Sequence, residues 1–498
     1  VAALASSENR TAPWIVLNED RDQFACQHVA QYPDEPITRE VVCAWADRWF
    51  RKPVTHCFVN PNAMTVFWDS KVFERQFDVH RERRCTMERD WRGHDRLMAA
   101  LEDMFRRGVD PHAIFIEKAR EKGIEPWLSM RMNDVHFVNI TNYFRNTTFY
   151  KTHPEWRCVP GLKDGLWEKF CMDYSVREVY DYHLAMAKEY LLDYESDGLE
   201  LDWMRSSPVL RPGAEEEGAA ILTRFVREVR AAAVEAARKW GHPVRIAMRV
   251  PARVSECLAI GMDVPAWAAE GLVDVVVPAP PSHVRTEQDA DITLWRKLLP
   301  ASVTLAPAID YAVSTDGNAA LTGDNETDCA FASNFYRQGA DTVYFYNHFP
   351  RHARERTDAQ EVFPLCADRT RAAAQVRRHV FTRHIPVGEG AASESRPFDT
   401  YRLNLGEGVA LFTLEKSPSP FSTSHFPFSQ DFPTSQNFPK FFQISQNFQI
   451  FWFFRSFRNL RISRVNRNLW NCRSSCRFLL PSPFNNGRGV RGRGSWNY

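Results

Sequence analysis

The stretch Val273-Asp274-Val275-Val276-Val277 is almost continuously apolar. A strand with one solvated face alternates apolar and polar side chains, whereas a strand of a parallel sheet covered by helices reads as an apolar run. The stretch therefore predicts a parallel sheet, and similar short runs lie on both sides of it. The eight predicted strands are Trp14–Asn18, Val54–Asn60, Glu125–Asn133, Gly198–Met204, Val244–Val250, Val273–Pro278, Val303–Asp310 and Thr342–Asn347.

Amphipathic segments alternate with these strands. The predicted helices are Glu40–Phe50, Arg96–Lys122, Val176–Tyr194, Ala219–Trp240, Val264–Glu270, Ile292–Leu299, Cys329–Gly339 and Ala367–Thr382. Eight alternations of strand and helix predict an α/β protein with a (β/α)8 TIM barrel over residues 14–384. A doubly wound open sheet is the main alternative. It is disfavoured because no glycine-rich phosphate-binding loop follows the first strand.

The ends of the chain differ from this pattern. Residues 1–13 form an N-terminal extension, and residues 385–415 begin a C-terminal β-domain with a hairpin at Tyr401–Leu414. The composition changes at Lys416 to Phe, Ser, Asn, Gln, Pro and Arg. We interpret residues 416–498 as a low-complexity tail that is disordered or results from a frameshift. Binding of single-stranded RNA by this aromatic and basic tail is the alternative.

The charge of the chain is divided unevenly. From Lys416 onward there are 12 Lys and Arg residues and one acid, which leaves 51 basic and 61 acidic residues in positions 1–415. This mild acidity gives no indication of nucleic-acid binding, and no run approaches the 18–20 or so apolar residues of a membrane span. The chain starts with Val and has no visible signal peptide. An incomplete N-terminus, the compartment (cytoplasmic or secreted) and the oligomeric state all stay open.

The eleven cysteines are odd in number and scattered, without a CxxC pair or a zinc-like Cys/His cluster. Reduced and mostly buried thiols are the interpretation that this spacing favours. We therefore expect no metal site, and the two-carboxylate chemistry described below requires no cofactor.

The most informative segment for chemistry is Asp197-Gly198-Leu199-Glu200-Leu201-Asp202-Trp203-Met204-Arg205. Side chains alternate across a strand, so the leucines and Trp203 share one face and Glu200, Asp202 and Met204 share the other. Unpaired buried charge is costly, and two acids on one inner face therefore indicate a polar pocket. Asp202 lies nearer the C-terminal rim of the barrel, where active sites are built. An internal ion pair between Glu200 and an arginine is the alternative.

Neighbouring strands supply further polar side chains. Arg131 and Asn133 alternate with apolar residues on the third strand, as does Arg249 on the fifth strand. We expect Arg131 and Arg249 to flank the two acids and to lower their pKa values. Asp310 ends the seventh strand as a second rim carboxylate, or alternatively as a loop-capping residue. Tyr346-Asn347-His348 ends the eighth strand, where His348 alone more often has a structural role.

The longest insertion, residues 137–172, follows the third strand and is rich in aromatic residues. Its aromatic residues include Phe137, Tyr143, Phe144, Phe149, Tyr150, Trp156, Trp167 and Phe170. They are suited to stacking on sugar rings, but a small core within the loop accounts for most of them in the alternative interpretation.

Two carboxylates beside arginine, asparagine and aromatic residues are typical of glycoside hydrolysis, which needs an acid and a nucleophile or base. The predicted catalytic residues are Asp202, with Glu200 or Asp310 as the second carboxylate. The predicted substrate-binding residues are Arg131, Asn133, Asp134, Arg205, Arg249, Tyr346, Asn347 and His348. Two alternatives stay open: a catalytically inactive carbohydrate-binding barrel, and a lyase or isomerase on the same fold.

The blocks Leu128–Asp134, Met172–Tyr174 with Val176–Val179, and Asp197–Arg205 resemble the glycosyl-hydrolase-like barrels once catalogued as domains of unknown function. The resemblance covers roughly residues 14–415. It implies a (β/α)8 barrel, a β-rich C-terminal domain and a polysaccharide or glycoside substrate.

The fourth strand is also similar to the chitinase-type pattern Asp-Gly-x-Asp-x-Asp-x-Glu. Aligning Asp197-Gly198 places Glu200 and Asp202 on the two inner aspartates and Met204 on the catalytic glutamate. Because methionine cannot donate a proton, the resemblance excludes a chitinase mechanism that uses this position.

Overall fold

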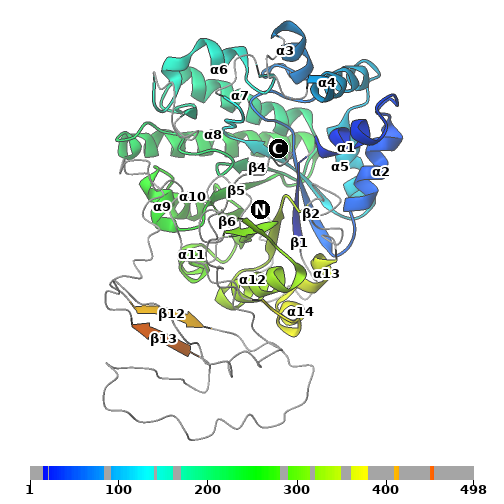
Figure 1. Cartoon of the computed structure of the whole chain (residues 1–498). Coiled ribbons are helices and arrows are strands. Elements are labelled where there is room, and N and C mark those ends of the chain that lie inside the picture. The colour runs from blue at the N-terminus through cyan, green and yellow to red at the C-terminus, as the bar shows by residue number, and fades with distance from the viewer. Residues whose placement is uncertain are drawn as a thin grey trace, which may run out of the picture.

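The computed structural model describes residues 15–20, 22–83, 91–138, 143–160, 170–280, 286, 290–314, 320–348, 361–378, 409–413 and 449–453. A ring of parallel strands lies at its centre, with helices around it (Figure 1). The predicted α/β barrel is confirmed. Its strands are β1 Ile15–Asp20, β2 Val54–Asn60, β3 Glu125–Arg131, β4 Gly198–Asp202, β5 Arg245–Pro251, β6 Val275–Ala279, β7 Thr304–Leu305, β8 Ala308–Asp310 and β11 Val343–Tyr346.

The barrel is closed by one short segment of chain. The strand order is β7-β6-β5-β4-β3-β2-β1-β11-β8, so the two ends of the sheet are β7 and β8, which are consecutive in the chain. Between them, the Ala306 amide donates to Val276 O at 2.9 Å, and Pro307 O accepts from the Tyr344 amide at 3.0 Å. Proline has no N–H to donate. The single predicted seventh strand therefore divides at Ala306-Pro307, where its pairing passes from β6 to β11.

Each predicted helix has a counterpart in the structure, two of them with clearly different bounds, and the structure adds short helices that were not predicted. The predicted helix Arg96–Lys122 is two helices, because Asp110 caps a new helix that starts at Pro111 and accepts the His112 and Ala113 amides. The predicted helix Ala367–Thr382 ends at Ala374, and its last residues lie outside the described part. The helices are α1 Gln23–Gln31, α2 Arg39–Trp49, α3 Gln76–Arg83, α4 Trp91–Arg106, α5 Pro111–Glu121, α6 Thr148–Thr152, η2 Pro154–Trp156, α7 Arg177–Asp193, α8 Glu215–Trp240, α9 Val254–Ala259, α10 Val264–Ala269, α11 Ile292–Leu298, α12 Asn325–Gln338, α13 Val362–Cys366 and α14 Arg369–Ala374.

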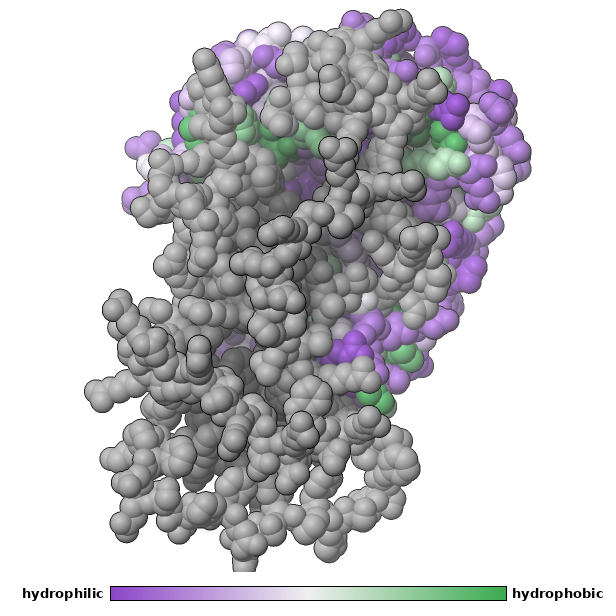
Figure 2. Space-filling model, viewed as in Figure 1, coloured by the Kyte–Doolittle hydropathy of each residue, from purple (hydrophilic) through white to green (hydrophobic). Residues whose placement is uncertain are grey.

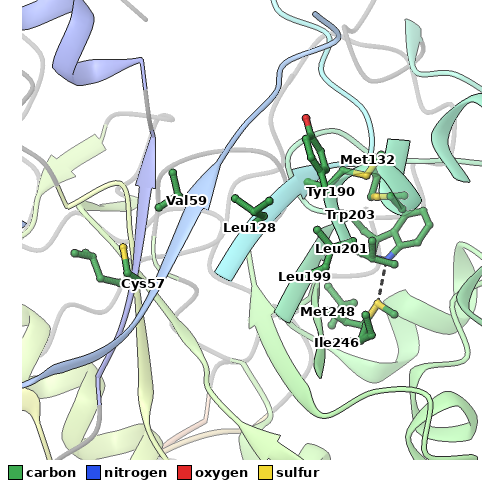
Figure 3. Packing of buried hydrophobic residues seen from close by; sticks show 14 of the residues in the cluster. Cys57, Val59, Leu128, Met132, Tyr190, Leu199, Leu201, Trp203, Ile246 and Met248 are labelled. Carbon is green, nitrogen blue, oxygen red and sulfur yellow. Dashed lines mark hydrogen bonds between the residues drawn. The ribbon is translucent and has the colours of Figure 1, made fainter. Parts of the chain in front are cut away.

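The alternation of β4 separates two cores. Leu199, Leu201 and Trp203 pack outward with residues of β3 and β5, and the Trp203 indole donates to the Met248 sulfur at 3.3 Å (Figure 3). Met204 belongs instead to the smaller cluster of buried residues that fills the barrel interior. The other members of that cluster are Val16, Phe58, Trp127, Ala247, Val275, Val277, Ala279, Ala306, Ala308, Tyr344 and Tyr346.

Gly198 is required by the packing at the base of this interior. A Cβ atom on Gly198 would lie 2.4 Å from the indole of Trp127 and 2.7 Å from the carbonyl oxygen of Arg245. The Trp127 ring stacks on Phe58 with centroids 4.7 Å apart, so it cannot move aside freely. The glycine therefore makes room for the indole.

Outside the barrel, β9 Ala312–Ser314 pairs with β10 Ala320–Thr322, and β12 Val409–Thr413 pairs with β13 Gln449–Phe453. The partner of β12 thus comes from the segment expected to be an unstructured tail. The extension 1–13, the rest of the predicted β-domain and the rest of the tail lie outside the described residues.

None of the helices in the described part has the length and apolar character that a bilayer crossing requires. On the face seen in Figure 2, the outer surface of the described part is mostly hydrophilic. The eight cysteines in the described ranges are free thiols, as expected.

Candidate active site

Glu200 lies in the barrel interior and is fully buried. Its Oε2 accepts hydrogen bonds from the Ser129 hydroxyl on β3 and, at 3.0 Å, from the Tyr344 hydroxyl on β11. Because β11 is four strands away from β4 in the sheet, this contact crosses the barrel. Burial and the nearby charge of Asp202 raise the pKa of Glu200 to about 8. The expected lowering of its pKa is therefore wrong, and Glu200 is protonated at neutral pH. The alternative of an ion pair to arginine is also not realised.

Asp202 ends β4 one layer higher and is only 1% exposed. Its Oδ1 accepts the backbone N–H groups of Met204 and Arg205, both at 3.0 Å. The same atom accepts from Nη1 of Arg249, also at 3.0 Å. Oδ2 makes no hydrogen bond to any residue that the structure describes. Oδ1 is thus held by three hydrogen bonds, which leaves Oδ2 available to contact a substrate.

Arg249 is the charged partner of Asp202. The two residues are in register on β5 and β4. The Arg249 guanidinium carbon lies 3.7 Å from the ring centroid of Tyr346 on β11, so the side chain extends across the mouth of the barrel. Burial alone would lower the pKa of Arg249, but Asp202, Tyr346, Asp310 and Tyr344 together outweigh it and hold that pKa above its usual value, with Asp202 contributing the most.

Asp310 ends β8 beside Tyr346, to which it is paired in the sheet. It is fully buried at the rim, and its charge helps to raise the pKa of Arg249. Its backbone is held by Thr286, whose hydroxyl accepts the Asp310 amide at 2.9 Å. Asp202, Arg249, Tyr346 and Asp310 therefore meet at one end of the barrel.

Arg131 flanks Asp202 in the sheet, because the two residues are in register on β3 and β4, but its side chain pairs with other acids and not with Glu200 or Asp202. It donates to Asp20 of β1 at 2.7 Å and to Asp134 at 2.9 Å. Asp134 also accepts from Nδ1–H of His136, whose Nε2 accepts from Arg205. Burial lowers the pKa of His136 to about 4, so the ring is neutral and relays hydrogen bonds rather than charge. The hydrogen bonds from Asp134 through His136 hold the side chain of Arg205. The backbone N–H of Arg205 donates to Asp202.

Both polar atoms of the Asn133 side chain bond to the loop that follows it. Its side-chain oxygen accepts the Met172 amide at 2.9 Å, and its Nδ2 donates to Met172 O at 3.3 Å. It thereby anchors the end of the long insertion. Together with Arg131 and Asp134 it borders a small cavity, which is also lined by Ala63, Met64, Phe73, Thr147, Phe149, Tyr150, Met172, Tyr182 and His183.

The insertion's aromatic residues mostly pack against other aromatic side chains of the protein. Tyr143 and Phe144 are buried and lie 4.5 Å apart, and Phe149 stacks on Tyr182 at 4.0 Å. Contacts within the insertion join Phe137, Tyr143 and Phe144, whereas Phe149 stacks on α7, and Trp167 lies outside the described residues.

The two residues after β11 differ in role. Asn347 has a left-handed backbone (φ 54°), and both polar atoms of its buried side chain lack a hydrogen-bond partner. Such strain and unpaired polarity concentrate at functional sites. His348 faces α12 instead, with Nε2 3.1 Å from Asp328 and Nδ1 3.2 Å from Tyr346 O. Both ring nitrogens are engaged, so the structure does not present His348 to a substrate.

Sequence reasoning missed Asp20 and Asp22, which pair with Arg131 and Arg145. The available signal was the acidic end of the first strand, since carboxyl ends of parallel strands meet at one edge. Sequence reasoning also did not predict the hydrogen bond from Tyr344 to Glu200.

Among the described residues, no group of three or more His, Cys, Asp or Glu side chains is arranged to hold a metal ion.

No protein-family model and no curated protein sequence matches the chain. Solved structures that match include an alpha-L-fucosidase (isoenzyme 2) from Paenibacillus thiaminolyticus, with 11% identity, a TM-score of 0.42, and coverage of 72% of this chain and 49% of that one. A GH36 alpha-galactosidase from Geobacillus stearothermophilus matches with 12% identity, a TM-score of 0.36 and coverage of 74% and 43%. A family 18 N-acetylglucosaminidase from Paenibacillus barengoltzii matches with 12% identity, a TM-score of 0.35 and coverage of 71% and 98%.

These neighbours are glycoside hydrolases, and this chain spans about half the length of the fucosidase and less than half of the galactosidase. With TM-scores below 0.5, the matches assign neither a substrate nor a catalytic residue to this chain.

Proposed function

We propose that this barrel hydrolyses a glycosidic bond of an oligo- or polysaccharide at the C-terminal ends of β4, β5, β8 and β11. The observation that carries the proposal is the contrast between two carboxyl groups on one strand. Glu200 is held protonated by burial with a pKa of about 8, whereas Asp202 is paired with the Arg249 guanidinium. A carboxyl group that holds its proton, beside one that is paired with an arginine, suits the separate roles of acid and base.

In the proposed reaction the protonated carboxyl group gives its proton to the glycosidic oxygen as the C–O bond breaks. Asp202 acts through Oδ2 in one of two ways. It takes a proton from the water that attacks the anomeric carbon, or it attacks that carbon itself to form a glycosyl ester, which water then hydrolyses as the deprotonated acid takes the water's proton. Glu200 is the proton donor that its pKa favours, and Asp310 at the rim is the alternative donor. Arg249 and Tyr346 position the sugar, and the hydrogen bonds of Ser129 and Tyr344 orient Glu200.

A catalytically inactive carbohydrate-binding barrel is the second candidate. Glu200, Asp202 and Asp310 are each at most 1% exposed, and a general acid must reach the glycosidic oxygen. This burial favours binding without turnover.

The experiment is a glycan array read both for binding and for released sugar, using the full chain with Asp202→Asn and Glu200→Gln. Hydrolysis by the wild type that is lost in both variants, and that declines above about pH 8 as Glu200 ionises, supports the proposal. Binding without released sugar supports the second candidate. An unsaturated sugar product would instead indicate a lyase and contradict hydrolysis.

A further inference from the structure

One edge of the buried Arg249 guanidinium makes no hydrogen bond to any residue in the described part of the chain. Nη1 donates to Asp202, but Nε is buried without a hydrogen-bond partner. Nη2 likewise makes no hydrogen bond to any described residue. Nε and Nη2 lie on the same edge of the planar group, and this edge is the one that grips the two oxygens of a carboxylate or a sulfate.

We propose that the sugar bound next to Asp202 carries an acidic group, a carboxylate or a sulfate ester, that binds to the Nε–Nη2 edge of Arg249. This inference rests on the proposed function for its location but not on turnover. A neutral sugar hydroxyl would satisfy one of the two donors, whereas an oxyanion satisfies both and matches their geometry.

The guanidinium is held in place before any ligand arrives. It comes from β5 and lies over Tyr346 of β11 with the guanidinium carbon 3.7 Å from the ring centroid, while Asp202 of β4 holds Nη1. These two contacts fix its plane and one of its ends. The arginine side chain is 2% exposed, so bulk solvent does not satisfy the unpaired edge. A group fixed in this way loses little conformational entropy on binding.

The neighbouring residues offer neutral hydrogen-bonding groups for the rest of the sugar. The Asn347 amide is buried with neither Oδ1 nor Nδ2 paired, and the hydroxyl of the neighbouring Tyr346 is a second neutral group. Both suit sugar hydroxyls. Asp202 and Asp310 oppose an incoming anion, but Glu200 adds no negative charge while it is protonated. Discrimination between acidic and neutral sugars then depends on the Arg249 edge.

The test measures binding of defined probes to the full chain by calorimetry. The probes are D-glucuronate and D-galacturonate, their neutral parents D-glucose and D-galactose, and inorganic sulfate. The proteins are the wild type, Arg249→Lys, Tyr346→Leu and the control Arg227→Lys. Lysine at position 249 keeps the positive charge beside Asp202 but lacks the paired Nε and Nη2 donors. The control residue Arg227 pairs with Glu270 at the surface of α8. If Arg249→Lys does not fold, Tyr346→Leu still tests the Nε–Nη2 edge. It removes the ring over which the guanidinium lies and leaves the charges unchanged.

We expect a uronate to bind the wild type and Arg227→Lys about 10- to 100-fold more tightly than its neutral parent, since hydrogen bonds to charged groups are the stronger ones. Arg249→Lys should abolish this preference and Tyr346→Leu should weaken it. Tight binding of sulfate alone, lost in Arg249→Lys, identifies a sulfated sugar as the source of the oxyanion. Equal affinity for acidic and neutral sugars, a preference that survives Arg249→Lys, or no binding of any anionic probe overturns the inference. Failure of hydrolysis with the anion preference intact contradicts only the proposed function.

Discussion

Arg249 donates to Asp202 across 3.0 Å, and both side chains are 2% exposed. The pair joins adjacent strands at the mouth of the barrel. Attraction between two buried charges offsets the cost of removing them from water only while both are present. The pair therefore couples the stability of the barrel to the chemistry of the candidate site.

Replacing Asp202 separates these two contributions. Asparagine retains an oxygen for the Met204 and Arg205 amides but removes the charge that faces Arg249. In Asp202→Asn we expect kcat/KM to fall at least about 100-fold. We also expect a loss of roughly 3 kcal/mol in the free energy of unfolding, measured by urea denaturation. Asp193→Asn, at the exposed pair with Lys71, is the control and should change stability by less than about 1 kcal/mol. Unchanged activity in Asp202→Asn would remove this residue from the mechanism.

The raised pKa of Glu200 predicts a pH-dependent stability. In the unfolded chain this carboxyl group ionises near pH 4.5, whereas in the folded protein it holds its proton up to about pH 8. Above pH 4.5 the unfolded state alone gains from ionisation, so stability from this group falls as the pH rises and levels off above about pH 8. The slope reaches at most about 1.4 kcal/mol per pH unit.

Urea denaturation of the wild type and Glu200→Gln between pH 5 and pH 9 measures this effect. The wild type should lose stability relative to the variant as the pH increases. A difference between the two proteins that does not vary with pH would show that Glu200 is already ionised.

Gly198→Ala tests the packing at the base of the barrel. The added methyl group would overlap both the Trp127 indole and the Arg245 carbonyl oxygen, and the backbone atom cannot rotate away. We expect a loss of about 3 kcal/mol in the free energy of unfolding. Gly213→Ala has open space but a φ of +86°, so it should lose only about 1 kcal/mol from backbone strain. Equal losses at the two positions would contradict the steric explanation.

Asn347 offers a matched pair of variants. Its φ of 54° is tolerated by glycine but not by alanine, so Asn347→Gly should be about 1 kcal/mol more stable than Asn347→Ala. Both variants lose the unpaired amide, and we expect both to lose carbohydrate affinity by a similar factor of about 10. Calorimetric unfolding and sugar titration of the two proteins check this. Retained affinity in both would assign the amide no part in binding.

The barrel and the orientation of β4 were predictable because both are local properties of the chain. Leu199 and Leu201 face outward and Glu200 faces inward because side chains alternate along any strand. The division of the seventh strand at Pro307 had a local signal as well, the missing N–H, but its consequence depends on strands that are distant in the sequence.

The amino-acid sequence by itself determined which side chains enter the barrel. Only the tertiary structure decided how they pair there. Arg131 and Arg249 were equivalent in the sequence pattern, and each is in register with Asp202 on a neighbouring strand. Only the Arg249 side chain donates to Asp202, whereas that of Arg131 reaches Asp20 on β1 and Asp134. Glu200 meets Tyr344 across 144 residues, and burial among such partners keeps it protonated. Register, closure and desolvation depend on contacts between distant segments, and no local pattern contains them.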